Sequence, residues 1–128
     1  MKAAELNLIL AWIWIALGFL SGALLGLRFD DEKWRGGYAS WVRRLYRLGH
    51  ISFFGLGVLN LMFFFTAPEL GRSTPLFRAA SLGFFIGALT MPPCCFIAAH
   101  RPAWKPLFAL PVTSLVTGAF ITVWLLII

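Results

Sequence analysis

Two histidines are the side chains in this sequence with the widest chemical range. His50 and His100 are the only histidines in the chain, and an imidazole can bind a metal, carry a proton or form hydrogen bonds. His50 lies near the start of one long apolar run, and His100 lies at the end of the next. If the two runs cross a membrane in opposite directions, both imidazoles reach the same membrane face. The spacing therefore predicts a shared site near one surface of the bilayer.

A haem b site is the first interpretation of this pair. Two histidines from facing helices can supply both axial ligands of a haem iron, so His50 and His100 are the predicted metal ligands. Gly57 follows His50 by seven residues on the same helical face and leaves room for a flat macrocycle. Arg47 and Arg101 lie where they could bind the propionates, because guanidinium groups pair well with carboxylates. The predicted cofactor site therefore consists of these five residues.

Other interpretations of the histidines stay open. They could contact a quinone or another pigment, or they could be solvated side chains with a structural role near the membrane surface. A Cu(I) site that joins His100 to Met91, Cys94 and Cys95 is disfavoured. The adjacent cysteines point about 100° apart on a helix, and His100 lies off either face.

A second group of residues suggests a different function. Asn60 is expected to be the only amide deep in the bilayer, and Pro92-Pro93 breaks an apolar run and frees backbone carbonyl groups. Broken helices at membrane depth often line a site or cavity. The alternative function is therefore an oligomeric channel or transporter for a small solute, built around Asn60 and the Pro92-Pro93 break.

Conventional enzyme catalysis has little support in the sequence. The five acidic residues all lie outside the long apolar runs, and no carboxylate pair, Ser/His/Asp set or phosphate-binding loop is present. We therefore expect a binding or assembly module without catalytic activity of its own.

The elements that must position these residues are long and apolar. Of the 128 residues, 60% are hydrophobic and 12% are charged, whereas soluble domains average about 45–50% apolar and about 25% charged residues. Four runs, at about residues 6–27, 48–67, 79–99 and 107–128, are each long enough to cross a hydrocarbon core as a helix. We expect an all-α integral membrane protein in which residues 1–128 form one domain, an antiparallel bundle of four transmembrane helices.

Basic residues predict the orientation of these helices. Eight of the eleven lie in the first and third connections, which the positive-inside rule places in the cytoplasm with both termini outside. The eight are Arg28, Lys33, Arg35, Arg43, Arg44, Arg47, Arg101 and Lys105; the other three are Lys2, Arg72 and Arg78. The same pattern explains the net charge of +6 without nucleic acid as a partner. A bacterial inner membrane is the expected location, with lipids and other transmembrane subunits as partners.

The first connection has an amphipathic pattern of its own. Trp34, Tyr38, Trp41, Leu45 and Leu48 share one face of a helix. The pattern predicts a short amphipathic basic helix on the inner membrane surface that leads into the second span. Tryptophans at both ends of the spans, among them Trp12, Trp14 and Trp124 on the outer side, are expected to anchor the protein at the interfaces.

Small residues predict where the helices pack closely. Gly18, Gly22 and Gly26 form a double GxxxG pattern in the first span, and Gly83 and Gly87 repeat it in the third. Ser114, Gly118 and Thr122 lie on one stripe of the fourth span. Such spacing lets two helix backbones approach closely, and helix packing is its expected role here.

Comparison with known small membrane proteins leaves two functions open. The chain lacks the buried glutamate in the first span that proton-coupled multidrug transporters of this size use, and its charge bias argues against the dual topology of fluoride channels. The histidines resemble those of cytochrome b-like bundles in organisation only. The expected function is an accessory subunit of a larger electron-transfer complex that holds haem b or contacts a quinone, and the alternative is the channel or transporter.

Overall fold

The computed structural model describes residues 3–71 and 74–128, so Lys2 and Arg72, which were counted for the orientation, lie outside it. Four long helices, all apolar enough to cross a membrane, account for most of this part of the chain, which contains no strand. They are α1 (Ala3–Gly26), α2 (Trp41–Thr66), α3 (Pro75–His100) and α4 (Ala109–Ile127). Short 3-10 helices, η1 (Trp34–Gly36), η2 (Ala67–Leu70) and η3 (Pro102–Phe108), lie between them. The prediction of four helices that are long and apolar enough to span a membrane is confirmed.

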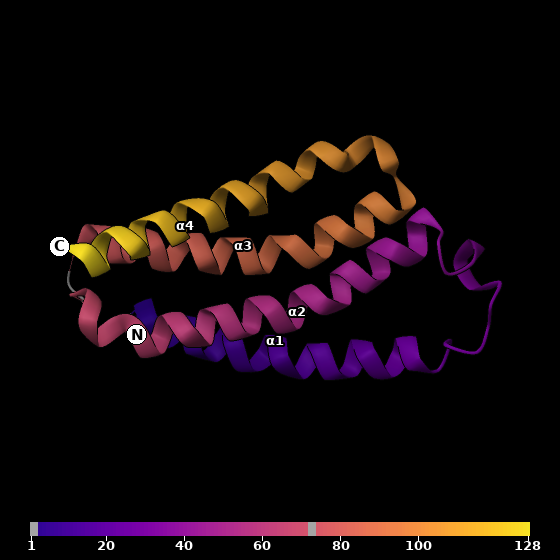
Figure 1. The fold of residues 1–128 in the computed structure, drawn as a ribbon, viewed down its shortest axis with the longest axis horizontal. Helices are drawn as coiled ribbons and strands as arrows, with labels where there is room; N and C mark the ends of the chain where they lie inside the picture. Colours follow the sequence, from indigo (N-terminus) through magenta and orange to yellow (C-terminus); the bar gives the residue numbers. More distant parts are fainter. Residues whose placement is uncertain (1–2, 72–73) are drawn as a thin grey trace.

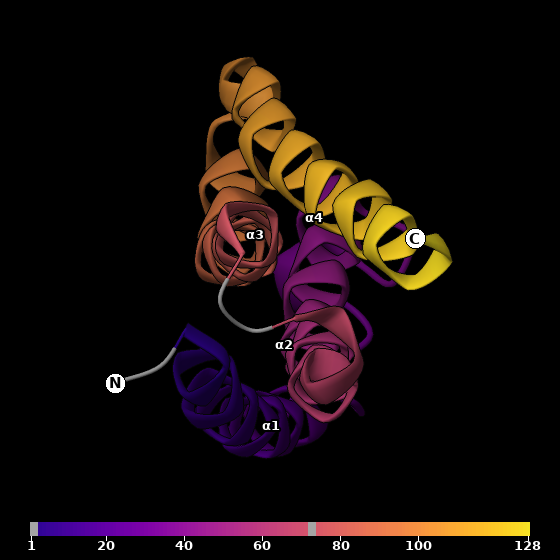
Figure 2. The ribbon, with the colours of Figure 1, turned by 90° about the vertical axis from the view of Figure 1, so that its left-hand side faces the viewer.

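The helices lie side by side along the long axis of the molecule (Figure 1). The α1–α2 and α3–α4 connections share one end, which we call the loop end, and both termini lie at the other, the terminal end (Figure 1). Each helix packs mainly on the next one in the chain, and α1 also touches α3. Seen along the axis, α1 and α4 lie on opposite sides of the molecule (Figure 2). The fourth helix therefore packs chiefly on α3.

The first connection differs from its prediction. The amphipathic pattern does not form one continuous helix, because η1 ends at Gly36 and α2 begins only at Trp41. Gly36 and Gly37 adopt φ values of +85° and +93°, a conformation outside the helical region that glycine accepts at little cost. The Ser40 hydroxyl then accepts a hydrogen bond from the Arg43 N–H and caps α2. The predicted surface helix is thus divided between a tight turn and the first turns of α2.

Glycines set the closest approaches between helices. A Cβ on Gly18 would lie 2.8 Å from the Phe54 ring, and one on Gly22 would lie 2.9 Å from Cε1 of His50. A Cβ on Gly83 would lie 2.7 Å from the Ser114 carbonyl oxygen of α4. Gly26 has nothing within 4 Å of that position. The predicted packing role is confirmed at three of these positions, whereas Gly26 is open.

A buried polar network ties three helices together near the terminal end. Asn7 of α1 donates to Oδ1 of Asn60 on α2 at 2.7 Å, and it accepts a hydrogen bond from the Ser81 hydroxyl of α3. Asn60 in turn donates to the Leu56 carbonyl of its own helix. All three linked side chains are buried. Asn60 is therefore not the only buried amide, as the sequence had suggested, because Asn7 is its hydrogen-bonding partner.

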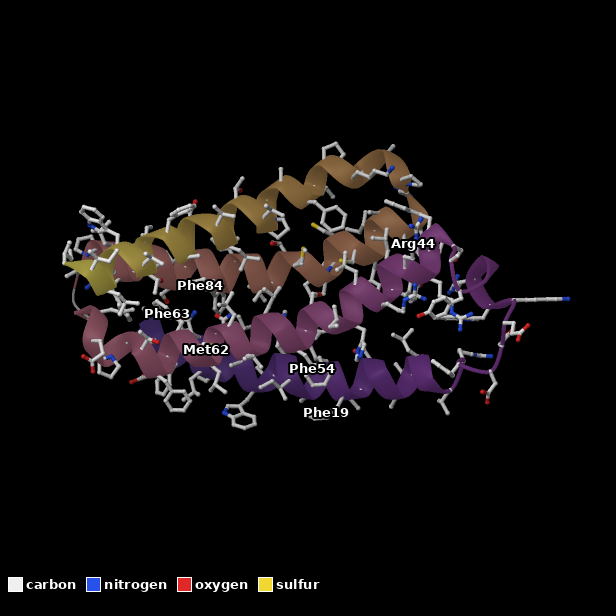
Figure 3. The ribbon with its side chains drawn as sticks, viewed as in Figure 1. Phe19, Arg44, Phe54, Met62, Phe63 and Phe84 are labelled. Atoms are coloured by element: carbon white, nitrogen blue, oxygen red, sulfur yellow. The ribbon has the colours of Figure 1, made fainter. Side chains whose placement is uncertain are left out.

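Aromatic packing surrounds this network. The Phe63 and Phe84 rings lie between α2 and α3 (Figure 3), with their centroids 5.2 Å apart, and Phe63 also stacks on Phe77. By contrast, Phe19 lies on the outer side of α1 (Figure 3) and is 68% exposed. The tightest apolar core is thus at the terminal end.

One proline in α3 has a partner on another helix. Pro92 has no N–H to give the Ala88 carbonyl four residues earlier, and the indole N–H of Trp14 donates to that carbonyl at 3.0 Å. Trp14 therefore lies in the middle of α1 and hydrogen bonds to α3, and the prediction that it anchors the outer interface is wrong. The helix continues through Pro92 and Pro93 to His100.

The same arrangement closes the end of α3. Pro102 cannot donate to the Ala98 carbonyl, and the Trp41 indole N–H donates to it at 2.9 Å. Trp41 is the first residue of α2. The indole thus ties the start of α2 to the end of α3 at the loop end, where the candidate site lies.

Candidate functional site

A pocket at the loop end, which we call the His50 pocket, is the candidate site. It lies among the first three helices and has a volume of about 240 Å³. Its lining is mostly apolar, with polar atoms on a few side chains. The lining residues are Ser21, Leu24 and Leu25 of α1, Trp34 of η1, Tyr46 and His50 of α2, and Phe96 of α3.

Helix geometry brings these side chains together. Tyr46 and His50 are four residues apart and so share one face of α2. Ser21 lies near the end of α1, and Phe96 lies near the end of α3, so both reach the same level at the loop end. Gly22 has no side chain, which leaves the space that the His50 imidazole occupies.

His50 is held by one hydrogen bond and one ring contact. Its Nδ1 lies 2.9 Å from the Ser21 hydroxyl oxygen, and its ring meets the Phe54 ring edge-on at 5.6 Å. Among the described residues, Nε2 has no hydrogen-bond partner, and no buried side-chain nitrogen or oxygen atom is left unpaired. Nε2 is therefore accessible and available to a ligand.

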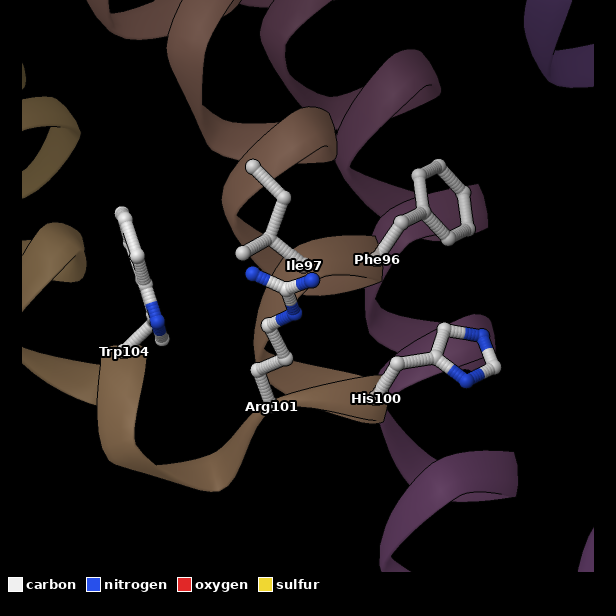
Figure 4. Close-up of a pocket in the computed structure, with 5 residues that line it drawn as sticks. All are labelled: Phe96, Ile97, His100, Arg101 and Trp104. Atoms are coloured by element: carbon white, nitrogen blue, oxygen red, sulfur yellow. The ribbon is translucent and has the colours of Figure 1, made fainter.

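His100 has a different partner. Its Nε2 lies 2.9 Å from the Tyr46 hydroxyl, and the Tyr46 ring also meets the Phe96 ring at 5.3 Å. His100 lines a second depression of about 440 Å³ with Phe96, Ile97, Arg101 and Trp104. In Figure 4, Phe96 and His100 point to one side of this depression and Trp104 lies on the other. The two imidazoles thus reach the same end of the molecule, but they line different pockets that share Phe96.

The structure does not place the two histidines as facing ligands. The Tyr46 hydroxyl holds Nε2 of His100, and His50 turns towards Ser21. A Cβ on Gly57 would lie 3.0 Å from the Ile15 side chain, so α1 fills the space beside this glycine. As they stand, these side chains do not fit around one haem, and the paired-ligand site stays a prediction.

The predicted propionate partners are also placed apart. Arg47 donates to the Tyr38 carbonyl at 3.0 Å and lies 4.0 Å from the centre of the Tyr38 ring. Arg101 is exposed beside His100 in the second depression. The two guanidinium groups therefore lie in different places at the loop end, Arg47 against Tyr38 and Arg101 beside His100.

Arg43 fixes the first connection over the pocket. It is 7% exposed and donates to the carbonyl oxygens of Asp31 and Phe29. Its guanidinium also lies over the Trp34 ring, 5.6 Å from the centroid. The neighbouring Arg44 is exposed at the same end (Figure 3). Arg43 thus holds Trp34 in place as one wall of the His50 pocket.

The contacts of the two cysteines do not form a metal site in the described part of the chain. Cys94 donates its S–H to the Leu107 carbonyl at 3.6 Å. Cys95 is buried. Within residues 3–71 and 74–128, no three His, Cys, Asp or Glu side chains come close enough to hold a metal ion.

Sequence reasoning found His50 but missed the side chains around it. Tyr46 could have been found from its position four residues before His50 on one helical face. Ser21 lies beside Gly22 in the glycine seam, and the seam itself indicated that α1 has a close neighbour there. Phe96 had no signal of its own in a chain with thirteen phenylalanines.

Comparisons with known proteins give no assignment. No family model, no curated protein and no solved structure matches this chain. The functional argument therefore depends on the geometry of the loop end.

Proposed function

We propose that this chain is an accessory subunit of a larger membrane electron-transfer complex and that its His50 pocket binds the headgroup of a quinone. The observation that carries the proposal is an accessible imidazole nitrogen in a small, mostly apolar pocket walled by aromatic rings. Ligand pockets of this kind combine an apolar lining with a few polar groups that orient the ligand. A substituted quinone ring has the matching chemistry: two flat apolar faces and an oxygen atom at each end.

The position of the pocket supports this occupant. Leu24 forms part of its wall and is 67% exposed on α1, so the pocket borders the lipid-facing surface. An isoprenoid tail can leave the pocket there and remain in the hydrocarbon. In the proposed orientation the helices form an antiparallel bundle in a bacterial inner membrane, with the loop end in the cytoplasm and both termini outside. The headgroup then lies near the cytoplasmic interface.

Quinone suits the pocket better than haem b. A haem with two histidine ligands needs both imidazoles across one space, whereas Tyr46 and Phe96 lie between the two pockets. The headgroup of a quinone, in its oxidised or its reduced form, needs only one imidazole beside it, and His50 supplies it. The channel alternative gains no comparable support, because Asn60 is hydrogen-bonded to Asn7 and the Ala88 carbonyl beside Pro92 is bonded to Trp14.

The exposed helix surfaces support a role as a subunit. The protein buries only 11% of the most apolar stretch of the span formed by η3 and α4, and only 17% of the corresponding stretch of α1. These two helices lie on opposite sides of the molecule. Both faces are available for lipids and for other transmembrane subunits.

Binding and colour of the purified protein test the proposal. We expect a colourless protein that binds a short-chain quinone in at least one of its two redox forms. We expect His50→Gln to weaken the binding of the tighter form about tenfold or more, since it removes the imidazole that hydrogen bonds to the headgroup oxygen. His100→Gln is the matched control, because His100 lies outside the pocket, and it should bind as the wild type does.

Two results would contradict the proposal. The first is a low-spin bis-histidine haem spectrum in protein from haem-replete cells that disappears in each histidine variant separately; it would restore the haem interpretation. The second is binding of neither quinone nor haem by a folded protein, which would leave the histidines a structural role.

A further inference from the structure

Ser21 lies where it favours one tautomer of the His50 imidazole over the other. The Ser21 hydroxyl has one hydrogen, and it donates to the Gly18 carbonyl one turn earlier at 3.0 Å. Both contacts of this hydroxyl are hydrogen bonds at once only if its oxygen accepts, at 2.9 Å, from Nδ1–H of His50, because a carbonyl oxygen cannot donate. In the neutral imidazole, Nδ1 then carries the hydrogen and Nε2 carries the lone pair.

The lone pair gives the His50 pocket a preference between redox forms. We propose that the pocket selects the reduced form, the quinol, with His50 Nε2 accepting a hydrogen bond from a quinol hydroxyl; this inference rests on the proposed function. A quinol presents an O–H group to an acceptor. A quinone presents a carbonyl oxygen, whose lone pairs would face the lone pair of Nε2.

Ser21 is a positioning residue in this arrangement. It contacts the imidazole at Nδ1, on the side away from the accessible nitrogen, and Gly22 keeps the imidazole close to α1. Removing the Ser21 hydroxyl leaves both nitrogens of His50 free, so the ring can present either an acceptor or an N–H donor. The preference between redox forms should then fall, although the pocket keeps its apolar walls.

A matched set of variants isolates this effect. Ser21→Ala removes the hydroxyl, and Ser21→Thr keeps it. Ser52→Ala is the control, because the Ser52 hydroxyl also donates to a carbonyl three residues earlier, that of Gly49, but it does not line the His50 pocket. All four proteins, including the wild type, are tested as full chains with a short-chain quinol under anaerobic reducing conditions and with its oxidised form.

The expected results separate this inference from the proposed function. The wild type, Ser21→Thr and Ser52→Ala should bind the quinol about tenfold more tightly than the quinone, and Ser21→Ala should lose most of that ratio. ¹⁵N spectra of labelled histidine should show His50 protonated at Nδ1 in the wild type and in Ser21→Thr, and a mixture of tautomers in Ser21→Ala. Tighter binding of the quinone, or protonation of Nε2 in the wild type, would overturn the inference and leave the quinone site standing. Binding of neither form would overturn the proposed function itself.

Discussion

Neighbouring residues of α1 act on the same imidazole in different ways. Ser21 bonds to Nδ1 of His50, while Gly22 leaves the space that the ring occupies. The sequence shows the GxxxG pattern, but it does not show which residues of the neighbouring helix face the glycines. That Gly18 meets Phe54 and Gly22 meets His50 depends on how α1 and α2 are rotated against each other, which many side chains along the interface determine together.

A methyl group at Gly22 should disturb the site directly. The Cβ of Gly22→Ala would lie 2.9 Å from Cε1 of His50, so the imidazole must move away from Ser21. We expect quinol affinity to fall about tenfold, which corresponds to the loss of one hydrogen bond to the ligand. Calorimetric titration of the purified protein measures the change.

The control for this variant lies one helical turn further along. Gly26→Ala adds the same methyl group where nothing lies within 4 Å, and its affinity should equal that of the wild type. Equal affinities in both variants would show that the imidazole position does not depend on Gly22.

The sequence predicted half of the site at this scale. It placed the two histidines at one end of the molecule, because helix length and alternating direction bring them there. It could not predict that the Tyr46 hydroxyl forms a hydrogen bond with Nε2 of His100. Tyr46 lines the His50 pocket, yet its hydroxyl bonds to His100, and this choice depends on side-chain rotation that helix periodicity does not fix.

At the scale of helices, prolines and donors from neighbouring helices form matched pairs. Pro92 frees the Ala88 carbonyl and Trp14 bonds to it, and Pro102 frees the Ala98 carbonyl and Trp41 bonds to it. In hydrocarbon no water can satisfy such a carbonyl. At Pro92-Pro93, where the sequence predicted a helix break, α3 therefore continues and a side chain of α1 replaces the missing hydrogen bond. The sequence of α3 alone could not show this, because the donor lies on another helix.

A double-mutant cycle tests the first pair. Trp14→Phe should lower the free energy of unfolding by about 1–3 kcal/mol, because it leaves the buried Ala88 carbonyl unpaired. Adding Pro92→Ala restores an N–H to that carbonyl, so Trp14→Phe should cost less in the Pro92→Ala background. Unfolding in mixed micelles measures all four proteins. Equal costs of Trp14→Phe in both backgrounds would mean that the indole does not compensate for the proline.

The buried amide network makes a second prediction at this scale. Asn7→Leu removes the partner of both Asn60 and Ser81 and should lower the free energy of unfolding by about 1–3 kcal/mol. Thr66→Val is the control, because the exposed Thr66 hydroxyl bonds only within its own helix, and it should change stability by less than about 0.5 kcal/mol. If Asn7→Leu proves as harmless as the control, the network is not an interhelical tie.

At the scale of the whole molecule, apolar runs and their lengths predicted the four helices well. The boundaries differ because α2 and α3 extend beyond the apolar runs, with Ser40 and Thr74 capping their first turns. What the sequence could not predict is the unequal packing of the helices. The third helix packs on α2 and α4, whereas α4 packs chiefly on α3. Hydropathy reports burial in lipid and in protein alike, so it does not distinguish an outer helix from a central one.

The orientation of the whole molecule can be tested with single cysteines. Ser40→Cys and Ala103→Cys lie in the two connections at the loop end, and Glu69→Cys lies in η2 at the terminal end. In intact cells, an impermeant thiol reagent should label Glu69→Cys and neither of the others, because the positive-inside rule predicts that the loop end lies in the cytoplasm. The wild type is the background control, since Cys94 and Cys95 are buried. Labelling at Ser40 and Ala103 alone would reverse the proposed orientation.

The proline-freed carbonyls have a consequence for biogenesis. In each pair the donor precedes the acceptor in the chain: Trp14 comes before Ala88, and Trp41 comes before Ala98. Synthesis runs from the N-terminus, so each donor leaves the ribosome before the carbonyl that it will bond. When a proline-containing helix enters the bilayer, the helix that compensates for its missing hydrogen bond has already been made. Insertion in chain order thus spares the protein a stage in which an unpaired carbonyl waits in lipid for a partner still to be translated.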